Sequence, residues 1–205
     1  MEQVLLDELR NYLVNKYGCH LIILYGSYAT GEYTAESDID VVCFCDDVGV
    51  ENDTTVLSGR QLDAWIYSTG SLNNIEPYLH ITDGKVIFDQ RGLGGAFLSQ
   101  IAERYAKEPE QLSEEQKQFL KRWLQKMLRR STKGDPEGDY RFHWMLTDSL
   151  EIYFKIKGLW FMGPKKSLKW LNQNDAYTYT LFKSALVRGA TSSDVARLIH
   201  HIVEL

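Results

Sequence analysis

The chain has 205 residues, 44% of them hydrophobic, which suffices for one large domain or two small ones with buried cores. No run approaches the roughly 20 apolar residues that span a bilayer, and the N-terminal residues lack a signal-peptide pattern. A net charge of −5 argues against broad nucleic-acid binding. We therefore expect a cytoplasmic protein with neither a membrane nor a nucleic acid as its partner.

The three cysteines, Cys19, Cys43 and Cys45, have neither disulfide nor zinc spacing. Such a set fits a reducing cytoplasm. Cys43 and Cys45 stand two apart in an apolar run, so we expect both to be buried as small apolar residues.

The first ninety residues alternate between helical and strand-like patterns. Short apolar or alternating runs predict strands over residues 20–25, 39–45, 60–67 and 85–89. Apolar residues at helical spacing predict helices over residues 3–17 and 71–79, and a further helix from Ser27. The acidic stretch 46–59 is expected to be a loop.

The strand-like runs stop at Gly92, Gly94 and Gly95, so we place a domain boundary between residues 93 and 94. Beyond it the pattern is helical, with expected helices over residues 113–130, 140–157, 164 onward, 174–187 and 192–204. Ser113 with Gln116 forms a capping-box sequence. The predicted fold class is α+β: a mixed-sheet domain over 1–93, then an antiparallel helical bundle over 94–205.

The two halves of the chain carry opposite charge. Residues 1–100 hold 5 Lys and Arg against 15 Asp and Glu, whereas residues 101–205 hold 18 against 13. This division favours an acidic metal-binding half and a basic half that attracts anionic phosphate, although ordinary compositional drift gives the same numbers.

Asp38 and Asp40 open the second predicted strand and, two residues apart, project from the same face. Asp63 stands in a later strand-like run. Converging carboxylates repel unless a cation neutralises them, and oxygen ligands suit Mg²⁺ or Mn²⁺. An isolated acidic pair is more often a solvated strand end. The order of strand, Gly26-Ser27, acidic pair, strand and third acid favours a metal site.

These residues give the chain a resemblance to a known family. Gly26-Ser27, Asp38-Ile39-Asp40 and Asp63 resemble the marks of the nucleotidyltransferase superfamily, which has the DNA polymerase beta-like fold. Thr30 departs from the pattern, since many members carry arginine there. The helical remainder resembles the second domain of kanamycin- and lincosamide-type nucleotidyltransferases, on its helix arrangement and the segment 164–171.

The resemblance implies a metal-dependent enzyme that moves a nucleoside monophosphate from an NTP, with ATP expected, to an acceptor hydroxyl and releases pyrophosphate. The expected acceptor is a small molecule, with antibiotic-like compounds as one option, and the sequence does not name it. Asp38, Asp40 and Asp63 would be the catalytic and metal-binding residues of a two-metal mechanism with Mg²⁺ or Mn²⁺. Gly26 and Ser27 would hold the terminal phosphates.

Lys165 and Lys166 follow Gly163-Pro164, a good helix start, and fall where the helix dipole disfavours cations. A nearby anion would explain them, so we place them in the nucleotide site, against the alternative of solvated surface lysines. Glu151 is a second candidate for the general base. A non-catalytic nucleotide-binding or antitoxin-like partner protein, an enzyme that modifies protein or RNA, and a homodimer all stay open.

Overall fold

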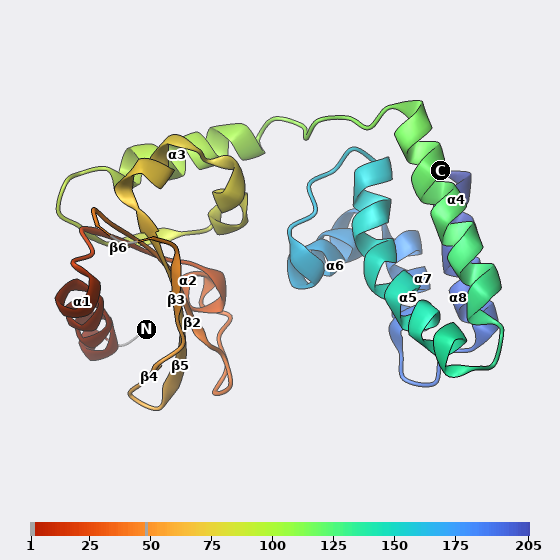
Figure 1. The fold of residues 1–205 in the computed structure, drawn as a ribbon, viewed down its shortest axis with the longest axis horizontal. Helices are drawn as coiled ribbons and strands as arrows, with labels where there is room; N and C mark the ends of the chain where they lie inside the picture. The colour runs from red at the N-terminus through yellow and green to blue at the C-terminus, as the bar shows by residue number, and fades with distance from the viewer. Residues whose placement is uncertain (1–2, 48) are drawn as a thin grey trace. The chain divides into compact units, whose positions relative to one another are not determined.

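The computed structural model describes residues 3–47 and 49–205. The chain divides into two compact units, Met1–Lys107 and Glu108–Leu205, and Figure 1 draws both. The first is an α+β unit and the second is all-helical, which confirms the predicted fold class. None of the helices in the described ranges is both long and apolar enough to cross a bilayer.

The first unit is built on a mixed sheet of six strands. The strands are β1 (Leu21–Leu24), β2 (Ile39–Cys45), β3 (Glu51–Asp53), β4 (Val56–Leu57), β5 (Arg60–Ser68) and β6 (Lys85–Asp89). Their order is β3-β5-β2-β1-β6, with β4 paired to β5, and only the β2–β5 pair is parallel. The helices are α1 (Gln3–Tyr17), α2 (Gly26–Thr30), α3 (Gly94–Tyr105) and the 3₁₀ helices η1 (Thr69–Asn73) and η2 (Glu76–Ile81).

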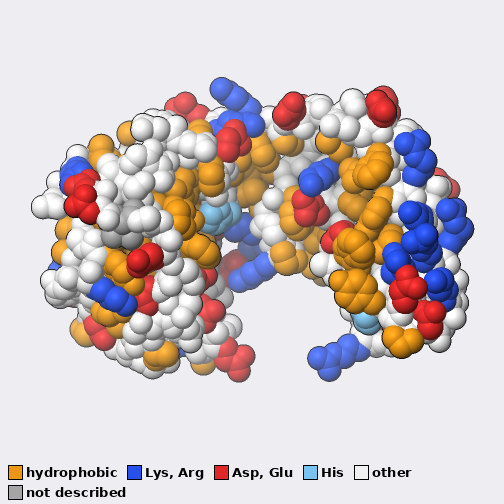
Figure 2. All heavy atoms as spheres, in the orientation of Figure 1, with side chains coloured by type: hydrophobic (Ala, Val, Ile, Leu, Met, Phe, Trp, Pro, Cys, Tyr) orange, Lys and Arg blue, Asp and Glu red, His pale blue; other side chains and the backbone are white. Residues whose placement is uncertain are grey.

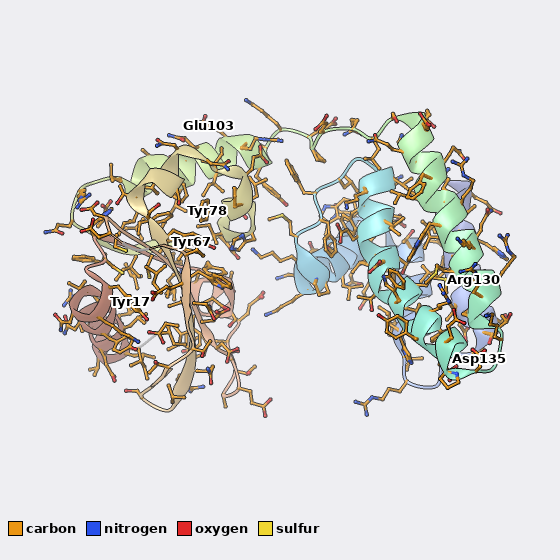
Figure 3. The ribbon with its side chains drawn as sticks, viewed as in Figure 1. Tyr17, Tyr67, Tyr78, Glu103, Arg130 and Asp135 are labelled. Atoms are coloured by element: carbon orange, nitrogen blue, oxygen red, sulfur yellow. The ribbon has the colours of Figure 1, made fainter. Side chains whose placement is uncertain are left out.

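The two faces of the sheet are covered by different helices. On one face, Cys43 and its same-face neighbours pack against Leu9 and Leu13 of α1. On the other, an aromatic cluster joins the sheet to η2 and α3: Tyr78 lies 5.2 Å from Tyr67 and 5.3 Å from Phe97 between ring centroids. Tyr67 and Tyr78 are labelled in Figure 3. This cluster places α3 in the first unit, so the division of the chain lies after Lys107 instead of after residue 93.

Residues 46–59 are not simply a loop, because they contain β3 and β4. Asp53 ends β3 and is 5% exposed. It accepts hydrogen bonds from Tyr12 Oη at 2.8 Å, Tyr17 Oη at 2.8 Å and Lys16 Nζ at 2.9 Å. Burial alone raises the pKa of Asp53, but the hydrogen bonds from Lys16 and Thr55 outweigh it and hold that pKa well below its usual value. The acidic stretch 46–59 can therefore form an edge strand, because Tyr12, Lys16 and Tyr17 of α1 donate to the Asp53 carboxylate.

The second unit is a set of five helices: α4 (Glu114–Ser131), α5 (Pro136–Ile156), α6 (Gly163–Asn174), α7 (Ala176–Leu186) and α8 (Ser192–Glu204). The predicted capping box at Ser113 and Gln116 is formed, with hydrogen bonds in both directions. Helix α5 starts four residues earlier than predicted, because Asp135 caps it by accepting from the Gly138 amide at 2.7 Å. The core joins α4, α5, α7 and α8 through side chains such as Met127, Tyr153 and Phe182.

Candidate active site

Asp40 and Asp63 lie opposite each other on neighbouring strands. The parallel register of β2 and β5 pairs Asp40 with Asp63, and the same alternation puts both on the face that carries Phe44 and Tyr67. Both residues are partly exposed. Two carboxylates on adjacent strands and one face form an acidic site at the start of these strands.

Gly26 brings backbone directly against one of these carboxylates. Its φ of +67° belongs to the left-handed region, which suits glycine. A Cβ built on Gly26 would collide with Asp40 Oδ2 and lie 3.1 Å from Asp40 Cγ. The amide before it, Tyr25 N, donates to the Asp40 carbonyl oxygen at 3.0 Å. Two separate features therefore favour glycine at position 26: the positive φ and the lack of space for a Cβ beside Asp40.

Asn52 holds the second carboxylate, and sequence reasoning missed it. Asn52 Nδ2 donates to Asp63 Oδ1 at 2.6 Å, from β3, the strand next to β5. The Ser58-Gly59 pair is a signal for strands within this acidic stretch, because it marks the turn from β4 into β5, although it does not point to Asn52 itself. Both residues have positive φ, at +45° and +74°, and they close the two-residue hairpin between β4 and β5.

Two phenols and an imidazole line the same site, and these too were missed. Burial, with the carboxylates of Asp40 and Asp63, raises the pKa of Tyr25 well above its usual value. Burial and Asp63 likewise raise the pKa of Tyr67. Tyr25 also contacts His80 of η2 edge-on, with ring centroids 5.2 Å apart. Both phenols therefore stay protonated at neutral pH and can donate hydrogen bonds beside the carboxylates.

Asp38 and Ser27 do not lie on the two strands that carry Asp40 and Asp63. Asp38 lies one residue before β2 and is exposed, whereas Ser27 lies in the short helix α2 and is partly exposed. Among residues 3–47 and 49–205, no three His, Cys, Asp or Glu side chains gather as a metal site. The register brings Asp40 and Asp63 together, whereas Asp38 lies just outside the paired residues. Two carboxylates still suit Mg²⁺, which binds one or two and completes its shell with water and phosphate.

The other predicted site residues belong to the second unit. Lys165 and Lys166 lie in the first turn of α6, as predicted, and that turn contains no acidic residue. Lys165 is exposed and Lys166 is partly exposed. Glu151 Oε1 forms an ion pair with Lys155 Nζ at 2.7 Å along α5. The alternative base is thus an ordinary i,i+4 partner on a helix surface.

Comparison with protein families identifies the family to which the chain belongs. The family model described as "Nucleotidyltransferase domain" matches residues 6–127, which is more than half of the chain. The chain therefore belongs to the nucleotidyltransferase domain family, which confirms the family prediction, and the matched region contains Gly26, Ser27, Asp38, Asp40 and Asp63.

The remaining comparisons add less. No curated protein matches the chain. Among solved structures, it is similar to a nucleotidyltransferase-like protein from Exiguobacterium sibiricum 255-15, with 13% sequence identity and a TM-score of 0.43. That match covers 97% of this chain and 74% of the other.

Proposed function

We propose that the protein transfers a nucleoside monophosphate from an NTP, with ATP as the expected donor, to a hydroxyl group of a small acceptor and releases pyrophosphate. The observation that carries this proposal is the Asp40–Asp63 pair with the Gly26 backbone against the Asp40 carboxylate. Membership of the nucleotidyltransferase domain family supports it.

The proposed roles follow from this geometry. Asp40 and Asp63, with Asp38 at the adjoining strand end, would hold Mg²⁺ or Mn²⁺. When bound, the metal neutralises charge on the phosphates and on the attacking and leaving oxygens. Gly26 allows the phosphate chain to approach the backbone, and Ser27 Oγ donates to it.

We assign to Asp63 the role of accepting the proton of the acceptor hydroxyl. Its hydrogen bond from Asn52 fixes the carboxylate and leaves its other oxygen to face the acceptor. The phenol of Tyr25 is partly buried near both carboxylates, and burial together with their charges raises its pKa, so it stays protonated and can donate to a phosphate or acceptor oxygen. We assign the helical unit to binding of the acceptor, with Lys165 and Lys166 as anion-binding residues.

The test is transfer from each radiolabelled NTP, with Mg²⁺ or Mn²⁺, to a panel of hydroxyl-bearing antibiotics and to a small-molecule cell extract. We expect a labelled product with one preferred NTP. Asp63→Asn should keep much of the NTP affinity but lose transfer by at least about a hundredfold, the scale for losing a catalytic base.

Glu115→Gln is a suitable control, because it changes an exposed carboxylate of α4 in the second unit. It should leave transfer unchanged. If Asp63→Asn and the wild type transferred labelled nucleotide equally well, Asp63 would have no role in the mechanism, and Glu151 would be the next candidate base to test. NTP binding without any transfer by the wild type would favour the non-catalytic alternative.

A further inference from the structure

From Gln116 to just past its end, helix α4 carries basic side chains with no acidic one among them. Residues 116–134 contain no Asp or Glu, and their cations are Lys117, Lys121, Arg122, Lys126, Arg129, Arg130 and Lys133. Figure 2 shows Lys and Arg side chains gathered over α4, and Figure 3 labels Arg130 on this helix. The surface here is strongly positive although the whole chain has a net charge of −5.

Neighbouring acids neutralise the two ends of this run. Lys117 pairs with Glu114 at 3.1 Å, and Lys133 pairs with Glu137 at 3.1 Å. Glu137 also pairs with Arg141 at 2.6 Å, and together Arg141 and Lys133 lower the pKa of Glu137 to about 2. These cations are therefore already used within the unit.

The cations between these ends have no such partners. In the described part of the chain five of them form no ion pair: Lys121, Arg122, Lys126, Arg129 and Arg130. Four of these share one side of the helix and are called the α4 basic face: Arg122, Lys126, Arg129 and Arg130. The helix dipole favours cations in the last turn, which accounts for Arg129 and Arg130. It does not account for the three cations further back along the helix.

Exposed aromatic rings border this basic face. Trp123 lies three residues before Lys126 on α4, at the spacing of neighbours on one helix face. Its ring is 5.6 Å from that of Trp144 on α5, and the Trp144 ring is 6.1 Å from that of Tyr140. Tyr140 is 69% exposed and Trp144 is 43% exposed. Trp144 Nε1 donates to Asp148 Oδ2 at 2.8 Å, which fixes the indole in place.

We propose that the α4 basic face and the adjoining rings of Tyr140 and Trp144 bind single-stranded nucleic acid. Phosphates would pair with Arg122, Lys126 and Arg130, and bases would stack on the two rings. Proteins that bind single strands without sequence preference combine these two elements, a basic track and exposed aromatic side chains. An acidic protein would satisfy the cations but would not need ordered, exposed rings beside them.

This inference departs from the expectation drawn from the net charge. That value averages an acidic first unit with a basic second one, whereas binding responds to the local field within about 10 Å. From Arg122 to Arg130 the helix rises about 12 Å, long enough to meet several phosphates of a strand. The inference does not depend on nucleotidyl transfer, because the binding requires neither NTP nor metal.

The experiment measures the fluorescence anisotropy of a labelled single-stranded RNA of about 20 nucleotides with the full chain, over a range of salt concentrations and without NTP or Mg²⁺. The test variant is Arg122→Gln, Lys126→Gln and Arg130→Gln combined. Its matched control replaces three exposed cations of the same unit that lie off α4, Lys157, Lys183 and Arg188, with glutamine.

We expect the test variant to bind at least about tenfold more weakly. Its slope of log Kd against log salt should be shallower by about 2, because each phosphate that the protein no longer neutralises lowers the slope by roughly 0.7. The control, with the same change in net charge, should bind nearly as the wild type does. Trp144→Ala should weaken binding by about fivefold or more, and Trp144→Phe should restore most of it.

Two results would overturn the inference. One is equal weakening in the test and control variants, which would reduce the effect to net charge. The other is no effect of Trp144→Ala together with equally tight binding of a polyglutamate peptide, which would make the face a site for acidic proteins. Single Gln variants and thermal unfolding of each protein keep the test valid if the triple variant folds poorly.

Discussion

Replacing Gly26 with alanine should separate backbone strain from damage to the site. Gly26 and Gly31, at the two ends of α2, both have positive φ, at +67° and +81°. A Cβ at Gly31 has no atom within 4 Å, whereas a Cβ at Gly26 collides with the Asp40 carboxylate. Gly31→Ala is therefore a control with the same kind of strain and no collision.

The strain should be similar in both variants. A non-glycine residue in the left-handed region costs about 1–2 kcal/mol. For a unit of this size each kcal/mol lowers the Tm by roughly 4–8 °C. Thermal unfolding followed by circular dichroism should therefore show both variants folded, each with a lower Tm than the wild type.

The functional effects should differ. In Gly26→Ala the Asp40 carboxylate must move by about 1 Å to reach ordinary van der Waals separation. A displacement of that size costs on the order of a hundredfold in rate when it disturbs reacting groups. Mg²⁺-dependent ATP binding by calorimetry and transfer of labelled nucleotide should both fall in Gly26→Ala and persist in Gly31→Ala. Equal loss, or equal retention, in the two variants would refute the placement of Gly26 against a functional Asp40.

Other predictions concern Asp53 and the lysines of α6. Asp53→Asn should lower the free energy of unfolding by about 2–3 kcal/mol in chemical denaturation, because the hydroxyls of Tyr12 and Tyr17 lose a charged acceptor; an unchanged midpoint would contradict this. Since the folded-state pKa of Asp53 is lowered, its stabilisation is complete above the unfolded pKa of about 3.9, decreases as the pH falls below that value and is lost only below the folded pKa; the difference in stability between the wild type and Asp53→Asn should therefore shrink steadily below about pH 3.9. Lys165→Gln with Lys166→Gln should weaken ATP or acceptor binding and make its salt dependence shallower; normal binding with a lower Tm would make these lysines structural.

The regular elements were predictable because their patterns are local. Ile39–Cys45 and Lys85–Asp89 are strands with the expected bounds, since each is a short run of strand-forming side chains. Residues 71–79 were predicted as one helix but lie in two 3₁₀ helices, Thr69–Asn73 and Glu76–Ile81. Pro77 is in the first turn of the second, so the chain restarts there instead of continuing one helix.

The site was only partly predictable for a related reason. The acidic pair and Gly26-Ser27 can be read along the chain, but the register of β2 and β5 joins residues far apart in it. That register pairs Asp63 with Asp40 and leaves Asp38 before the strand. Asn52 and His80 reach the site from a polar edge strand and a 3₁₀ helix, whose sequences carry no periodic signal.

If Asp40 and Asp63 form a metal-dependent nucleotide site, as we claim, Asp40→Asn should change ATP binding in a way that calorimetry can measure. The change removes one charge and keeps the shape of the side chain. With Mg²⁺ present, we expect the affinity to fall by at least about tenfold relative to the wild type, because the cation that joins carboxylate to phosphate loses a ligand. Without Mg²⁺ the two proteins should bind equally weakly. Equal affinity of Asp40→Asn and the wild type in the presence of Mg²⁺ would contradict the claim.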